Sequence, residues 1–99
     1  MKQLLAMTAV AALTLSANVF AQDGEAVYQK ACKVCHEVGV AGAPKAFDVA
    51  AWEPRLGLGL DTLVKTVQAG KGAMPPNGMC MDCSVEDFQN AIDYMSKAK

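Results

Sequence analysis

The chain has 99 residues, of which 53% are hydrophobic and 19% are charged, with four Cys, one His and a formal net charge of −1. This length allows a single domain, and the near-neutral charge argues against nucleic acid as a partner because phosphate binding needs a basic excess. A single His excludes any site that needs two imidazoles, such as a His-rich zinc centre.

The first 21 residues are much more apolar than the rest and resemble an export signal. An uncharged apolar stretch over residues 4–15 has the length of the hydrophobic core of a signal peptide, and small residues then precede a predicted cleavage between Ala21 and Gln22. A retained membrane helix is the alternative, but it needs about 20 apolar residues. We therefore expect residues 1–21 to be a signal peptide and residues 22–99 to form a periplasmic domain without a stable membrane anchor.

The first predicted helix of the mature domain leads into the only His of the chain. Asp23 can cap a helix that begins near Gly24 and runs to about Cys32. Apolar side chains recur along it at the spacing of one helical face: Val27, Tyr28, Ala31 and Cys35. Residues 37–47, which contain two Gly and one Pro, predict a loop.

Two further helices are predicted in the middle of the chain. A short helical turn over residues 48–53 should stop at Pro54, because a residue before proline avoids the helical region. Asp61 should cap a third helix that ends at Gly70. Its apolar side would consist of Leu60, Leu63, Val64 and Val67.

The last part of the chain combines an irregular segment with a final helix. Residues 70–83 hold three Gly, two Pro and two Cys, which predicts a long loop, and such a loop in a small domain is usually functional. Ser84 should open the last helix, with Asp87 as its capping-box partner. Val85, Phe88, Ile92 and Met95 would form its buried stripe. No strand pattern is present, so we expect an all-α domain of three to four short helices.

The sequence Cys32-Lys-Val-Cys35-His36 is the attachment signature of c-type haem. Two thiols at this spacing reach the two vinyl groups on one edge of the porphyrin, and the next side chain points at the iron. We therefore predict thioether bonds at Cys32 and Cys35 to a single haem c, with His36 as the proximal ligand. The alternatives are a structural disulfide and a redox-active dithiol, although the dithiol normally follows a strand and precedes a helix.

The long loop offers a second ligand to the iron. Met74 lies in the sequence G-A-M-P-P, where Pro75 and Pro76 stiffen the chain and lower the entropy lost when the thioether is fixed. We predict Met74 as the distal ligand, with Met79 and Met81 as the alternatives. Each could instead simply fill a gap in the core.

A second C-x-x-C pair, Cys80 and Cys83, has no His after it. Two thiols this close should form a disulfide in an oxidising compartment and would brace the loop that carries the methionine. The alternative joins them with Cys32 and Cys35 in a four-Cys zinc site. That site would need an unusually long separation, since 44 residues lie between the pairs, and it would leave His36 without a role.

Together these motifs resemble the class I c-type cytochromes, and in particular the small bacterial cytochrome c5 group, over residues 23–98. The resemblance rests on the segments G-E-A-V-Y, C-K-V-C-H, G-A-P-K, A-A-W-E-P-R-L, G-K-G-A-M-P-P and C-M-D-C-S. It implies a small cytochrome c fold wrapped around one covalently attached haem.

The resemblance also implies roles for residues around the haem. Pro44 matches the proline whose carbonyl accepts a hydrogen bond from the ring N–H of the proximal histidine, here His36. Trp52 and Arg55 match a segment that lines the propionate edge, and the alternatives are plain core packing for Trp52 and a solvated surface charge for Arg55.

Two further implied contacts lie away from the iron. Gly24 and Tyr28 would cross the last helix near Tyr94, because glycine permits a close approach. Cys80 and Cys83 match the disulfide that is typical of the cytochrome c5 group.

The expected function is that of a periplasmic one-electron carrier and not of an enzyme. With His36 and Met74 on the iron, it would shuttle electrons between respiratory partners, from a reductase donor to an oxidase or peroxidase acceptor in the membrane or periplasm. An exposed haem edge could also serve as a homodimer contact. The alternative is an enzyme or gas sensor with an open distal site, in which Met74 does not bind the iron.

Overall fold

The fold consists of short helices joined by irregular segments. The computed structural model describes residues 21–99, so all of the predicted signal peptide except Ala21 lies outside the described residues. The described helices are α1 (Gly24–Val27), a π-helical turn (Tyr28–Cys32), α2 (Lys33–His36), α3 (Val49–Leu56), α4 (Leu60–Ala69) and α5 (Val85–Ser96). Because α1, the π-helical turn and α2 are continuous, the described chain has four helical segments, and the predicted all-α fold is confirmed.

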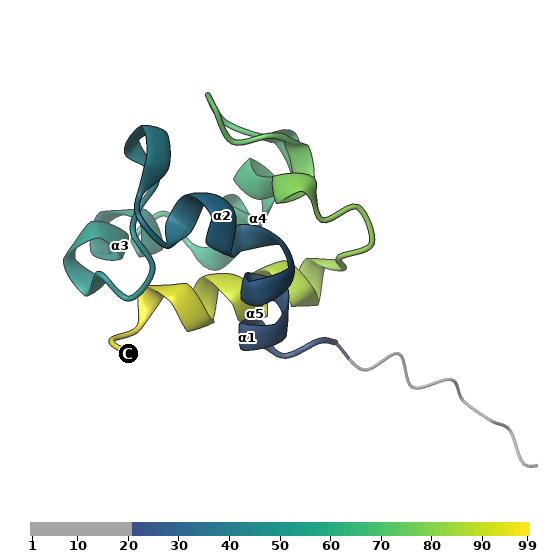
Figure 1. Ribbon diagram of the computed structural model, residues 1–99, viewed down its shortest axis with the longest axis horizontal. Helices are drawn as coiled ribbons and strands as arrows, with labels where there is room; N and C mark the ends of the chain where they lie inside the picture. The colour runs from purple at the N-terminus through teal and green to yellow at the C-terminus, as the bar shows by residue number, and fades with distance from the viewer. Residues whose placement is uncertain (1–20) are drawn as a thin grey trace, which may run out of the picture.

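Figure 1 shows α5 along one side of the domain, with α1 crossing it and α2 in the centre. The segment after α2 and the segment after α4 both project on the side of α2 that faces away from α5 (Figure 1). These two projections contain 3-10 turns, at Val40–Gly42 and Pro76–Met79. The longest described helix, α5, has 12 residues, and none of the helices within residues 21–99 meets the length and hydropathy that a membrane span requires.

The first helical segment is longer than predicted and changes register within it. The Asp23 side chain accepts a hydrogen bond from the backbone N–H of Ala26 and caps α1, as expected. The segment does not end at Cys32, because a π-helical turn there continues directly into α2. A π turn holds an extra residue and rotates the later residues of the segment relative to a straight α-helix. As a result Cys32, and not the predicted Cys35, packs against the hydrophobic core.

Helix α3 runs through Pro54 to Leu56, so the prediction that it stops at the proline is wrong. Pro54 cannot donate a backbone hydrogen bond, but the bonding resumes after it where the N–H of Gly57 donates to the carbonyl of Glu53 at 3.2 Å. The Asp48 side chain caps the first turn by accepting from the N–H of Ala51.

Helix α4 begins two residues earlier than predicted. Its N-cap is Gly59, with a φ of 92°, and Asp61 lies inside the first turn, where a negative charge favours the helix dipole. Gly70 ends the helix as predicted, with its N–H donating to the carbonyl of Thr66 at 2.9 Å. Leu63 and Val64 of the predicted apolar side are buried.

Helix α5 begins with the predicted capping box. The Asp87 N–H donates to Ser84 Oγ at 3.1 Å, and the Ser84 N–H donates to Asp87 Oδ2 at 2.9 Å. Phe88, Ile92 and Met95 are buried as expected, but Val85 is 47% exposed. Val85 is the first residue of the helix, where the side chain lies beyond the edge of the core.

The crossing of α1 and α5 requires glycine at its centre. A Cβ on Gly24 would collide with the carbonyl oxygen of Asn90 and lie 2.7 Å from Cβ of Tyr94. The Tyr28 and Tyr94 rings lie beside this crossing, with centroids 5.4 Å apart. The crossing implied by the resemblance is therefore present.

Candidate functional site

Cys32, Cys35 and His36 lie together at the end of the first helical segment. His36 is only 7% exposed, and its Nδ1 lies 2.8 Å from the carbonyl oxygen of Pro44. A carbonyl can only accept, so Nδ1 carries the proton and donates it, which leaves Nε2 as the ring nitrogen with a free lone pair.

Backbone hydrogen bonds fix the loop that presents Pro44 to two different helices. The N–H of Ala46 donates to the carbonyl of His36, and the N–H of Phe47 donates to the carbonyl of Met95, both at 2.7 Å. Two adjacent amides therefore tie this loop to α2 and to the end of α5. Sequence reasoning missed both contacts, since backbone groups leave no residue signal.

Trp52 lies beside the imidazole ring of His36. The two ring centroids are 5.7 Å apart with an interplanar angle of 30°, and Trp52 Nε1 donates to the carbonyl of Lys45 at 3.0 Å. Arg55 Nη1 donates to the carbonyl of Ala51. Each side chain thus donates a hydrogen bond to a backbone carbonyl, and the place of both at the propionate edge stays a prediction.

The two thiols of the motif are separate and partly buried. Cys32 and Cys35 form no disulfide, and burial raises the pKa of the Cys32 thiol to about 11. A redox-active C-x-x-C pair depends on a lowered pKa, which keeps one thiol ionised at neutral pH. The environment of Cys32 therefore disfavours the dithiol alternative.

Met74 sits in a tight turn of the segment after α4. The backbone N–H of Lys71 donates to the carbonyl of Met74, and the N–H of Met74 donates back to the carbonyl of Lys71, both at 2.9 Å. Met74 is half-buried, whereas Met79 is 75% exposed and Met81 is 78% exposed. The turn thus holds Met74 in place while the two alternative ligands face solvent.

Gly70 allows the chain to pack closely behind Met74. Its φ is 79°, and a Cβ there would lie 2.8 Å from the carbonyl oxygen of Met74 and 2.9 Å from the nitrogen of Pro76. Only glycine fits this combination of backbone conformation and close contact.

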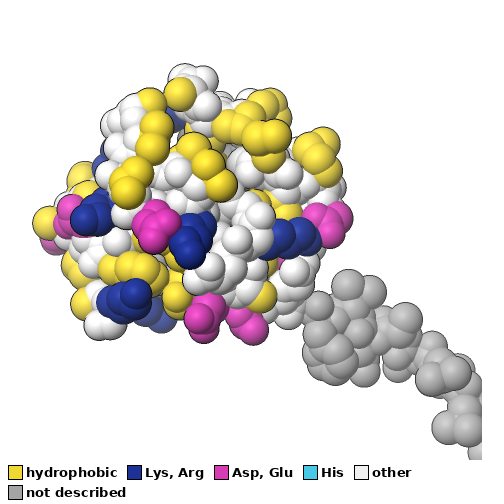
Figure 2. Space-filling view, viewed as in Figure 1, with side chains coloured by type: hydrophobic (Ala, Val, Ile, Leu, Met, Phe, Trp, Pro, Cys, Tyr) yellow, Lys and Arg dark blue, Asp and Glu magenta, His cyan; other side chains and the backbone are white. Residues whose placement is uncertain are grey.

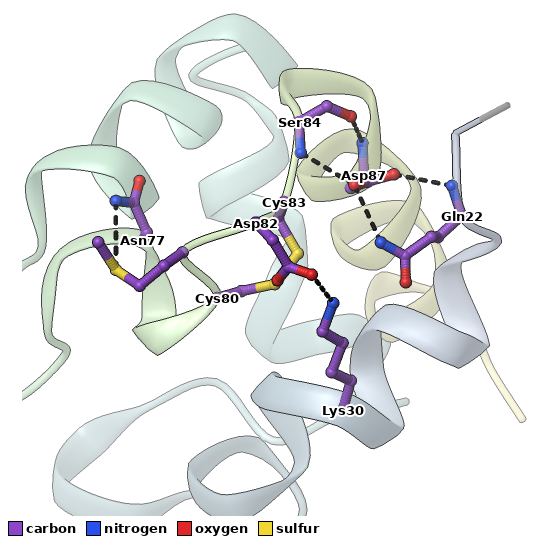
Figure 3. The surroundings of a disulfide bond; sticks show 9 residues. Gln22, Lys30, Asn77, Cys80, Asp82, Cys83, Ser84 and Asp87 are labelled. Atoms are coloured by element: carbon purple, nitrogen blue, oxygen red, sulfur yellow. Dashed lines mark hydrogen bonds and ion pairs between the residues drawn. A yellow bond between two sulfur atoms is a disulfide. The ribbon is translucent and has the colours of Figure 1, made fainter. Parts of the chain in front are cut away.

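A disulfide joins Cys80 and Cys83 next to the start of α5 (Figure 3). Cys80 is buried in the core, so the bond anchors the end of the segment that carries Met74. With both sulfur atoms in a disulfide, the four-Cys zinc alternative loses two of its ligands.

The disulfide turn is also bound to the first helical segment. Lys30 Nζ lies 2.7 Å from Asp82 Oδ2, and this contact lowers the pKa of the Asp82 carboxyl (Figure 3). The two groups are far apart in the sequence and carry no pairing signal, so sequence reasoning missed them. The ion pair links the helix with the haem motif to the turn that closes the Met74 segment.

Large apolar side chains remain exposed around this region. Figure 2 shows hydrophobic side chains gathered over the two projections and the surface between them. The exposed large apolar residues of α2 and the two projections are Val34, Val38, Val40, Met79 and Met81, and Leu56, Leu58 and Leu60 are exposed where α3 is joined to α4. So much exposed apolar surface on a small domain indicates a missing contact. Together with two free thiols and a free imidazole nitrogen, it fits a covalently bound haem.

Comparisons with known proteins agree with this site. The model of the family described as "Cytochrome C oxidase, cbb3-type, subunit III" matches residues 20–95. Cytochrome c5 of Azotobacter vinelandii is 44% identical over 78 residues, which cover 77% of this chain and 94% of that protein. Cytochrome c5 of Ectopseudomonas mendocina is 42% identical over 83 residues, which cover 82% of this chain and 95% of that protein.

A solved structure extends the agreement to the fold. The mono-heme ferrocytochrome c from Shewanella putrefaciens is 61% identical, with a TM-score of 0.70 over 81% of this chain and 99% of that chain. The chain therefore belongs to the c-type cytochrome family. Within that family it is a small class I cytochrome c that carries one covalently bound haem c and acts as an electron carrier, not as an enzyme. The resemblance drawn from the sequence is confirmed.

Proposed function

We propose that this cytochrome is a periplasmic one-electron carrier with His36 and Met74 as axial ligands of its haem and with thioether bonds from Cys32 and Cys35. The observation that carries the proposal is the contact between His36 Nδ1 and the carbonyl oxygen of Pro44. It fixes the tautomer, so the only lone pair of the imidazole is on Nε2, the nitrogen that would face the iron.

The side chains that would bind the iron would set its reduction potential and restrict its movement. When bound, the haem supplies a one-electron couple at its iron. Donation from His36 to the Pro44 carbonyl makes the imidazole a stronger donor. A soft thioether from Met74 favours the reduced iron and raises the reduction potential. Because both ligands belong to restrained segments, little moves when the electron enters or leaves.

Export to the periplasm is supported by the sequence before the domain and by the disulfide. Cleavage between Ala21 and Gln22 would leave eight Lys and Arg against ten Asp and Glu. A Cys80–Cys83 disulfide is stable in an oxidising compartment and not in a reducing cytosol. Haem attachment to Cys32 and Cys35 would come after export.

The proposed partners are membrane or periplasmic redox proteins of a respiratory chain. One similar structure, described as an electron transfer complex of nitrite reductase with cytochrome c, is 48% identical with a TM-score of 0.67 over 74% of this chain and 89% of that chain. In this chain the exposed Val34, Val38 and Met81 lie next to the two C-x-x-C pairs and would form an apolar contact surface. The same surface could bring two copies together as a homodimer.

An absorption spectrum of the exported protein, oxidised and reduced, tests the proposal. We expect a low-spin spectrum that carbon monoxide does not alter, since Met74 occupies the distal position. Met74→Ala should open that position and admit carbon monoxide, whereas Met79→Ala, at an exposed methionine of the same segment, should behave as the wild type. Rapid carbon monoxide binding to the wild type would instead favour an open-site enzyme or gas sensor.

A further inference from the structure

Asp87 is a buried carboxylate with more hydrogen bonds than a helix cap requires. It is only 4% exposed, and its Oδ2 accepts from the Ser84 N–H, which completes the capping box. Gln22 adds two contacts, with its backbone N 2.8 Å from Oδ1 and its Nε2 3.3 Å from Oδ2 (Figure 3). Donation from the Ser84 N–H is the main reason why the pKa of Asp87 is lowered, so the buried group is ionised at neutral pH.

Within residues 21–99, this buried charge has no cationic side chain as its partner. The ion pairs within residues 21–99 join Lys30 to Asp82 and Lys97 to Asp93, and neither includes Asp87. A buried charge without an opposite charge is costly, and the cost falls sharply when a cation is supplied.

The charged groups around Asp87 increase this need. The charged residues on the helices that contact α5 are Asp23 and Glu25 in or beside α1, Lys30 in the π-helical turn, Glu53 and Arg55 on α3, and Asp61 and Lys65 on α4, while Asp82 on the disulfide turn and Glu86 on α5 lie close to Asp87 in the chain. The pKa of Asp82 is lowered, mainly by its hydrogen bond with Lys30, and the negative charge of Asp87 opposes this shift. None of these cations forms an ion pair with Asp87 in the described part of the chain.

We infer that Asp87 is the anchor of the mature N-terminus, whose α-ammonium group forms when the chain is cut between Ala21 and Gln22. The cut would convert the Gln22 backbone nitrogen, already 2.8 Å from Asp87 Oδ1, from an amide into a cation. Asn90 Nδ2 donates to the Gln22 carbonyl at 3.0 Å and holds the same residue from its other side. This inference rests on the proposed export and cleavage, and it makes removal of the leader a step that completes the packing of α5.

The pair also protects the new terminus from a chemical change. An N-terminal glutamine cyclises when its α-nitrogen attacks the side-chain Cδ: a C–N bond forms, the bond from Cδ to Nε2 breaks, and ammonia leaves. Only the deprotonated α-nitrogen can attack. With the Gln22 α-nitrogen protonated on Asp87 and Nε2 held on the same carboxylate, cyclisation should be slow.

The contribution of this pair depends on pH in a defined direction. An unperturbed α-amino group has a pKa of about 7.7–8.0, and the Asp87 carboxylate should raise it in the folded protein. Stability from the pair is then complete below the unfolded value and is lost as pH rises through the higher folded value. On the acid side it is lost as pH falls through the lowered pKa of Asp87.

The sharpest test inserts one serine between Ala21 and Gln22 and exports the holoprotein, with its N-terminus established by intact mass. The insertion keeps an amide N–H on Gln22, as in the structure, but moves the positive charge away from Asp87. We expect the unfolding equilibrium constant at neutral pH to rise roughly tenfold. The gap between the two proteins should close as pH rises above the folded pKa of the terminus.

Two variants separate the charge pair from the capping box. In an Asp87→Asn background the insertion should have no effect, because the anionic partner is gone. Gln22→Ala should keep most of the stabilisation, because the α-ammonium remains. Wild-type protein incubated at alkaline pH should lose ammonia more slowly, by mass spectrometry, than Asp87→Asn protein.

An insertion that leaves stability unchanged at neutral pH, or that lowers it equally at all pH values, would overturn the inference. An intact mass showing that the mature chain begins at a residue other than Gln22 would also overturn the inference. The haem spectrum of the wild type reports on the proposed electron-carrier function independently, so the failure of either idea can be recognised without the other.

Discussion

The two sides of the proposed haem site are built in different ways. On the proposed proximal side, His36 directly follows Cys35, and ring and backbone hydrogen bonds to the Pro44 loop orient it. On the proposed distal side, Met74 lies far in the sequence from the cysteines that would hold the haem, so its segment has to be positioned by other means. Glycines at positive φ, two prolines and a disulfide are concentrated there. In the proposed arrangement, covalent attachment would position one ligand, and the fold would have to position the other.

The largest expected effect comes from the proximal side. His36→Ala should abolish the normal low-spin absorption spectrum, because no second imidazole exists in the chain. Glu37→Ala, at the exposed neighbouring position, is the matched control and should leave the spectrum unchanged. A normal spectrum in the histidine variant would overturn the assignment of the proximal ligand.

The next effect should come from the glycine behind Met74. Gly70→Ala places a Cβ 2.8 Å from the Met74 carbonyl oxygen at a φ that alanine avoids, and we expect a loss of about 3 kcal/mol in the free energy of unfolding. Gly72→Ala also has a positive φ but open space around it, and should cost about 1 kcal/mol. Chemical denaturation of both holoproteins measures the difference, and equal losses would show that the close contact is unimportant.

Removal of the disulfide should have a smaller effect. Replacing Cys80 and Cys83 by serine releases a very short loop, for which chain entropy gives about 2 kcal/mol. The double variant should also bind carbon monoxide more readily than the wild type, because the Met74 segment is less restrained. Wild-type protein treated with a reductant of disulfides should match the double variant in both measurements. Haem bound through His36 should still be seen in the absorption spectrum of both proteins.

The smallest effect is expected at Trp52. Trp52→Phe keeps a ring near His36 but leaves the Lys45 carbonyl without its indole donor, a loss of about 1 kcal/mol by thermal or chemical denaturation. The low-spin absorption spectrum should persist, since the contact between His36 and the Pro44 carbonyl does not depend on the indole. A shift in the reduction potential as large as that of Met74→Ala would contradict this division of roles.

Much of the fold could be predicted from residue patterns, and one clear exception is the first helical segment. The Ser84–Asp87 capping box, the end of α4 at Gly70 and the buried stripe of α5 depend on local signals and were predicted. The π-helical turn was not predicted, because a single extra residue in a helical turn leaves no sign in the spacing of the apolar residues. For the same reason Cys35 was placed on the core face instead of Cys32.

Contacts between distant segments were beyond the sequence. Two contacts, between Lys30 and Asp82 and between Gln22 and Asp87, join residues that are far apart in the sequence. Polar and charged residues on a surface have many possible partners, so the sequence does not select these. The haem motif itself was visible because its chemistry demands a fixed spacing. The sequence already favours Met74 over Met79 and Met81 because two prolines follow it, and the structure adds the turn that holds it.

The two amides of the Pro44 loop have a consequence for the order in which the site is completed. The N–H of Phe47 needs the carbonyl of Met95, which is among the last residues to be made. A chain synthesised from its N-terminus therefore presents Cys32 and Cys35 well before it can close the loop around His36. Docking of the last helix is therefore the step that completes the hydrogen bonds of the loop beside His36.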